Sequence, residues 1–190
     1  MYEAFINWGN YLGNLAKLKM GNDAEALYVQ AFEKFQKAID IKPDNHSAFI
    51  NWGNYLGNLA KINKGKDAEA FYTQAFEKYQ KAIDLKPNDH EVFNIWGIYL
   101  GYYAQTKEGK DAEDLYIQAF EKLKKSIKYG GSSYNLSCLF ALKGDKENAL
   151  KNLELCLSTN GIEVDFVEKD EDWRSLFNDE DFINILNKYK

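Results

Sequence analysis

The sequence has little of several residue types, and each shortage excludes a class of protein. Its 190 residues include two cysteines, two prolines and two histidines, too few for a disulfide scaffold or a proline-rich structure. Arg174 is the single arginine among 24 basic residues, whereas nucleic-acid binding relies on basic clusters and arginine forks. No run approaches the roughly 20 apolar residues of a membrane helix, and no signal peptide is recognisable. We therefore expect a cytoplasmic protein that neither inserts into membranes nor binds nucleic acid.

What the sequence does contain is a folded array with an acidic end. It is 45% hydrophobic and 15% aromatic, which is typical of a chain with a buried core. The net charge of −5 is uneven, because residues 163–181 hold most of the excess acid. The Lys-, Asn- and Ile-rich composition suggests an AT-rich bacterial genome.

An internal repeat of 44 residues dominates the chain. Residues 4–17 and 48–61 read the same, AFINWGNYLGNLAK, and a third, more diverged copy begins at Val92. Each copy has two segments with apolar residues at helical spacing. The first helix is expected to bury Phe5, Trp8, Gly9, Leu12 and Ala16, with Ile6 well away from that face. The second is expected to bury Ala24, Leu27, Tyr28, Ala31, Phe35 and Ala38.

Helix ends are also visible in the sequence. Asp23, Asp67 and Asp111 follow a glycine and are interpreted as N-caps of the second helices. Asn45 and Asp89 can cap the next first helix. Pro43 and Pro87 follow the ends of second helices. The repeating unit is therefore a helical hairpin.

The repeat resembles the tetratricopeptide repeat family. Eight residues match its signature in order in the first copy: Phe5, Trp8, Gly9, Leu12, Ala31, Phe35, Ala38 and Pro43. The copies depart from it in length, since the family repeat has 34 residues, so both helices should be longer. The resemblance implies an all-α fold, a right-handed α-solenoid of antiparallel helical hairpins.

The resulting layout is a tetratricopeptide-like array over 1–160 and a helical cap over 161–190. The array has hairpins at about 2–45, 46–89 and 90–131 and a shorter one at 132–160. The cap resembles the acidic end of some bacterial members. Its apolar residues would close the core, and they are Trp173, Leu176, Phe177, Phe182, Ile185 and Leu186.

No catalytic constellation, cofactor or metal site is predicted. His46 and His90 lie at the same repeat position, and no third zinc ligand is evident; we interpret them as loop residues beside caps. Cys138 and Cys156 are interpreted as buried thiols. The acidic run 163–172 lacks the spacing of a calcium loop. Gly9 and Gly13 have a Gly-x-x-x-Gly spacing that favours close helix packing.

A ligand-binding groove is the favoured site, because in this family the first helices line a concave face. Asparagine carboxamides there could bond to an extended peptide backbone, and Asn10 is expected beside Asn54 and Asn14 beside Asn58. Basic residues of the family's carboxylate clamp are missing. The candidate groove residues are Ile6, Asn10, Asn14, Lys17, Ile50, Asn54, Asn58, Lys61, Asn94, Ile98 and Tyr102.

Two functions remain open at this point. The first is a non-catalytic interaction scaffold that binds a peptide or protein partner in the groove. The second is a structural module that self-associates as a homo-oligomer through the first repeat, whose apolar helix has no preceding polar cap. The same feature is equally expected if the chain is cut from a longer array.

Overall fold

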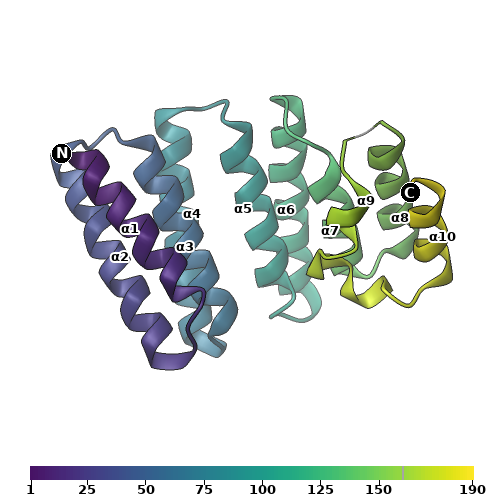
Figure 1. Ribbon diagram of the computed structural model, residues 1–190, viewed down its shortest axis with the longest axis horizontal. Helices are drawn as coiled ribbons and strands as arrows, with labels where there is room; N and C mark the ends of the chain where they lie inside the picture. The colour runs from purple at the N-terminus through teal and green to yellow at the C-terminus, as the bar shows by residue number, and fades with distance from the viewer. Residues whose placement is uncertain (160) are drawn as a thin grey trace. The chain divides into compact units, whose positions relative to one another are not determined.

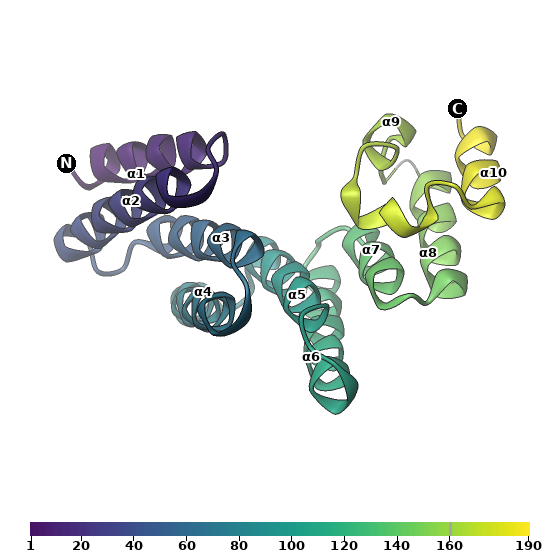
Figure 2. The same ribbon diagram turned by 90° about the horizontal axis from the view of Figure 1, so that it is seen from below.

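The computed structural model describes residues 1–159 and 161–190, and every regular element within them is helical (Figure 1). The chain divides into two compact units, Met1–Val92 and Phe93–Lys190. In both units consecutive helices lie side by side as antiparallel pairs (Figure 2). The all-α fold built from helical hairpins is therefore confirmed. Asn160, where the predicted array ends, lies outside the described residues.

The first unit contains two long hairpins. Its helices are α1 (Tyr2–Ala16), α2 (Gly21–Ile41), α3 (His46–Ile62) and α4 (Gly65–Leu85). Helix α3 contacts both α1 and α2, so the second hairpin packs on the first through its first helix.

The second unit contains a third long hairpin, a short hairpin and a cap. Helix α5 starts at the end of the first unit. The elements are α5 (His90–Ala104), α6 (Gly109–Lys128), α7 (Tyr134–Lys143), α8 (Lys146–Ser158), α9 (Val164–Val167), the 3-10 helix η1 (Glu171–Leu176) and α10 (Glu180–Lys188).

The extra residues of the long repeats lengthen both helices of the hairpin. Helices α1 and α2 have 15 and 21 residues, whereas α7 and α8 have 10 and 13. The predicted lengthening is confirmed, and the second helix gains more than the first.

The predicted helix caps are right between hairpins and wrong within them. Asn45 accepts a hydrogen bond from the Ala48 amide, and Asp89 accepts from the amides of the following helix. Asp23, by contrast, lies inside the first turn of α2, which begins at Gly21, and the same holds for Asp67 and Asp111. Gly21 has a φ of +57°, a conformation that glycine adopts readily. The turn at this glycine, and not an aspartate cap, begins the helix. The three aspartates lie in the first turn, where a negative charge interacts favourably with the helix dipole.

The core of the first unit follows the predicted apolar face of the second helices. Ala31, Phe35 and Ala38 are completely buried, and Leu27 is half-buried. The prediction for α1 is partly wrong, because Trp8 is 52% exposed. Its indole is instead covered by the Lys34 ammonium, 4.3 Å from the ring centroid.

The cap shares one core with the short hairpin. Trp173, Phe182 and Leu186 are buried in the same cluster as residues of α7 and α8. Leu176, Phe177 and Ile185 pack against that cluster. Cys138 and Cys156 are both buried and free, as predicted.

Candidate binding face of the first helices

Two glycines on α1 allow neighbouring helices to approach closely. A Cβ at Gly9 would lie 2.8 Å from Cε1 of Phe35 on α2. A Cβ at Gly13 would lie 2.4 Å from Cε1 of Tyr55 on α3. Both distances are too short for real contacts, so each glycine makes room for an aromatic ring. The predicted close packing at the Gly-x-x-x-Gly spacing is confirmed.

Tyr55 connects α3 to the inner face of α1, which is the side that carries Asn10 and Asn14. Its hydroxyl lies 3.1 Å from both the Asn10 carbonyl oxygen and Asn14 Oδ1. Its ring stacks on Phe35 with centroids 5.8 Å apart, and the Lys17 ammonium lies 5.3 Å from its centroid. Burial raises the pKa of Tyr55, so the hydroxyl remains a donor. The bond turns the Asn14 carboxamide oxygen toward the tyrosine and leaves its amide hydrogens as the other polar edge.

The equivalent asparagines of the two hairpins differ in their partners. Asn54 Oδ1 accepts a hydrogen bond of 2.9 Å from the Tyr79 hydroxyl on α4. At the equivalent position in α2 the residue is Phe35, and Asn10 Oδ1 is buried without a hydrogen-bond partner. A single missing hydroxyl thus separates two otherwise matching sites. Hydroxyls of Tyr55 and Tyr79 bond to the predicted row of asparagines, and no spacing in the sequence indicated these contacts.

The structure changes the placement of one candidate groove residue in the first unit. Ile6 is 9% exposed and belongs to the core cluster, so its predicted position away from the packed face is wrong. The reason is that α1 packs against both α2 and α3, which widens its buried face. Ile50 and Asn58 are half-buried, and the lysines are exposed. The exposed lysines are Lys17 and Lys61.

In the second unit the candidate residues contact other parts of the chain. Asn94 Oδ1 accepts a hydrogen bond from Asn135 Nδ2 on α7 at 2.9 Å. Ile98 is half-buried. The Tyr102 hydroxyl donates to Asp172 Oδ1 in η1 at 2.7 Å. Burial and the Asp172 carboxylate raise the pKa of Tyr102, which keeps it protonated as the donor.

Tyr134 on α7 holds the same cap segment. Its hydroxyl donates to Asp170 Oδ2 at 2.8 Å and accepts from Trp173 Nε1 at 2.9 Å. Tyr134 occupies the place of Ile6 in the repeat frame, and like Ile6 it is buried in a core cluster. Nothing in the sequence indicated that the aspartates would be its partners. The inner face of this unit is therefore covered by residues 170–173.

Three potential metal ligands lie close together where this segment meets α7. The Cys138 thiol and the carboxylates of Asp170 and Asp172 lie within 4.8 Å of one another. Burial raises the pKa of the Cys138 thiol, and both carboxylates accept tyrosine hydroxyls. The thiol therefore stays protonated, and the carboxylates are already engaged as hydrogen-bond acceptors.

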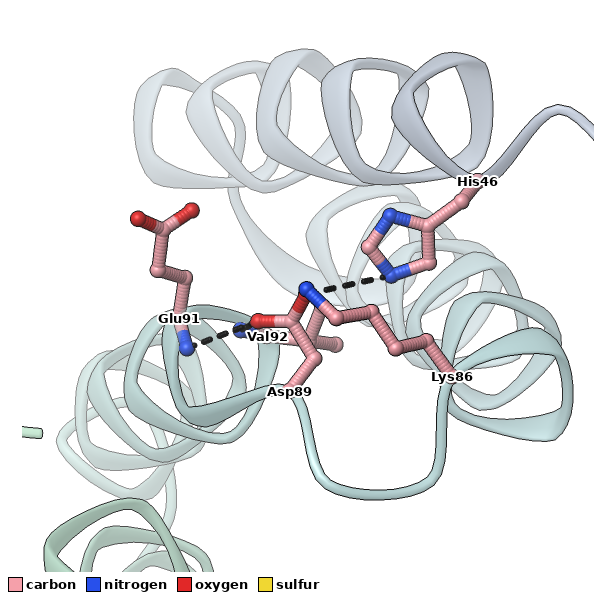
Figure 3. A network of polar contacts seen from close by, with 5 residues as sticks. All are labelled: His46, Lys86, Asp89, Glu91 and Val92. Carbon is pink, nitrogen blue, oxygen red and sulfur yellow. Dashed lines mark hydrogen bonds and ion pairs between the residues drawn. The ribbon is translucent and has the colours of Figure 1, made fainter. Parts of the chain in front are cut away.

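The histidine of the second hairpin has a structural partner (Figure 3). His46 Nε2 lies 3.3 Å from Asp89 Oδ2, and Lys86 Nζ lies 2.9 Å from the same oxygen. Burial lowers the pKa of His46. Burial alone would raise the pKa of Asp89, but hydrogen bonds from Lys86 and the Val92 amide hold it below its ordinary value. Asp89 also caps α5, so this group joins the start of α3 to the loop after α4.

Comparison with known proteins gives one family. Residues 2–95 match the family model of the plant-specific mitochondrial import receptor subunit TOM20. The chain is similar to an import receptor. The match spans just under half of the 190 residues, and it covers the first unit and the start of α5. It supports a helical-repeat protein, whereas the tetratricopeptide family itself and a bacterial-type end-cap are not confirmed by it.

The same match corrects two expectations from the sequence. A plant-specific mitochondrial family contradicts both the bacterial source and the cytoplasmic location. Composition misled because lysine and asparagine content reflects many influences besides the organism. No curated protein matches the chain. Among the described residues, no helix is long and apolar enough to cross a membrane.

Proposed function

We propose that this chain is a non-catalytic receptor that binds a segment of a partner polypeptide on the inner face of α1 and α3. The proposal rests on one observation, which is that the matched region and the first unit end at nearly the same residue. The import-receptor match ends at residue 95, and the first unit ends at Val92. By analogy with the family name, the partner is a mitochondrial precursor protein.

The chemistry of this face suits an extended main chain. Asn14 and Asn58 both have carboxamides, a group that can donate and accept hydrogen bonds at the same time. The Tyr55 hydroxyl fixes the orientation of the Asn14 group, so less conformational entropy is lost on binding. Half-buried Ile50 adds an apolar contact. Recognition of this kind tolerates many ligand sequences, as an import receptor requires.

The test uses a fluorescein-labelled mitochondrial targeting peptide, which is amphipathic and arginine-rich, titrated by fluorescence anisotropy. We expect the double variant Asn14→Ala/Asn58→Ala to bind about thirtyfold more weakly, because two hydrogen bonds of roughly 1 kcal/mol each are lost. Far-ultraviolet circular dichroism checks that both proteins are equally helical. Unchanged affinity, or no binding by the unaltered chain, overturns the proposal.

A charge reversal on the same face is expected to strengthen peptide binding, whereas the asparagine variants weaken it. Lys61 is exposed on α3 and repels an arginine-rich peptide on this face. Lys61→Glu should therefore tighten binding by about threefold at low salt, the scale of one exposed ion pair. The matched control is Lys151→Glu on α8, also exposed, which should leave affinity unchanged. Equal effects of the two reversals would place the peptide elsewhere.

A further inference from the structure

One stripe of identical residues differs in exposure between α1 and α3. Residues 4–17 repeat residues 48–61 letter for letter. In α3, Ala48 and Leu59 are completely buried, and Tyr55 is 6% exposed. Their counterparts in α1 form the outer stripe, defined as Ala4, Trp8, Tyr11 and Leu15. Tyr11 is 67% exposed and Trp8 52%.

The packing of α3 shows what this surface contacts when it is covered. Tyr55 stacks on Phe35 and lies beside Tyr28, with ring centroids 6.1 Å apart for the second pair. Trp52 stacks on Phe32 at 6.1 Å. These same side chains, in α1, stand on a surface without such a neighbour. Exposed aromatic clusters of this kind mark protein interaction sites.

The charge pattern favours a second copy as the occupant. Groups that lie close to a twofold axis meet their own copies, so a charged side chain there would be repelled by its equivalent in the partner. Between Ala4 and Ala16, α1 has no charged residue.

The C-terminal end of the array excludes head-to-tail stacking. Head-to-tail stacking needs an uncovered apolar surface beyond α8, against which the outer stripe of another copy could pack. In the second unit Trp173, Phe182 and Leu186 cover the core of α7 and α8. We infer that the outer stripe forms an isologous homodimer interface, in which α1 of one copy packs against α1 of the other. An isologous contact closes on itself and stops at two copies.

Sedimentation velocity of the full chain from about 1 µM to about 500 µM tests the interface, a range in which weak dimers appear. We expect dimers to accumulate with concentration. Tyr11→Glu should weaken dimerisation by about tenfold or more, because it removes an aromatic anchor and sets two charges near the axis. The matched control is Ile62→Glu, since Ile62 is 57% exposed and lies off the stripe.

Crosslinking gives an independent readout. The native thiols are buried, so in a Tyr11→Cys variant the new thiol is the accessible one. Oxidation by copper-phenanthroline should trap covalent dimers and nothing larger, whereas Ile62→Cys should remain monomeric. The inference is overturned by a monomer at every concentration, by larger assemblies, or by equal effects of Tyr11→Glu and Ile62→Glu.

Discussion

The inner face of the first helices is used differently in the two units. In the first unit its asparagines are braced by tyrosines from neighbouring helices, such as Tyr55. In the second unit Tyr102 and Tyr134 bind the aspartates of the cap. The same position in one fold thus supports packing between hairpins in one case and holds the end of the chain in the other. A repeat position therefore has no function of its own until its neighbours are known.

The largest effect is expected from a substitution that breaks the contact between the cap and the short hairpin. Trp173 is completely buried, stacks on Phe182 at 5.3 Å and donates to Tyr134. Trp173→Ala should lower the free energy of unfolding by about 3–5 kcal/mol, because it leaves a cavity. Urea denaturation measures the loss, and hydrogen exchange should rise over α7 to α10.

The matched control for this change is Ile183→Ala, also in the cap but 41% exposed. Its cost should stay within about 0.5 kcal/mol, the usual range for surface substitutions. Similar losses from both variants would mean that the cap is not anchored by the tryptophan.

A smaller effect is expected where hairpins meet in the first unit. In an exposed helix, Gly→Ala is stabilising by about 1 kcal/mol. At Gly13 the added Cβ meets the Tyr55 ring, so we expect a net loss of about 1–3 kcal/mol from overpacking. Thermal or urea unfolding gives the sign. Asn7→Ala, at an exposed position of the same helix, should not destabilise, and a gain at Gly13 would contradict the close packing.

The smallest effect compares the two copies of one position. Phe35→Tyr should provide Asn10 Oδ1 with the hydroxyl that Tyr79 gives Asn54. The expected gain is about 0.5–1.5 kcal/mol, the net value of one hydrogen bond. The reverse change, Tyr79→Phe, should be destabilising. Opposite signs in urea unfolding would support the assignment, whereas two losses would show that the first hairpin cannot accept the hydroxyl.

Much of the fold was predictable because each hairpin is a local structure. The helix pairs, the buried alanines of α2 and the caps Asn45 and Asp89 depend on residues a few positions apart. The site was less predictable. Ile6 is buried because α3 adds a second neighbour, and Tyr102 meets Asp172 across 70 residues of sequence. The helical spacing of apolar residues says nothing about contacts between residues so far apart in the sequence.

The sequence by itself determined the repeat, its helical hairpins and the neutral, carboxamide-rich first helices, since these follow from periodicity and composition. Tertiary structure alone decided which copies of those residues are covered. Tyr11 and Tyr55 stand in identical segments, yet one is exposed and the other lies over Gly13. The physical reason is that burial depends on the neighbouring hairpin, which a residue's own sequence context does not contain.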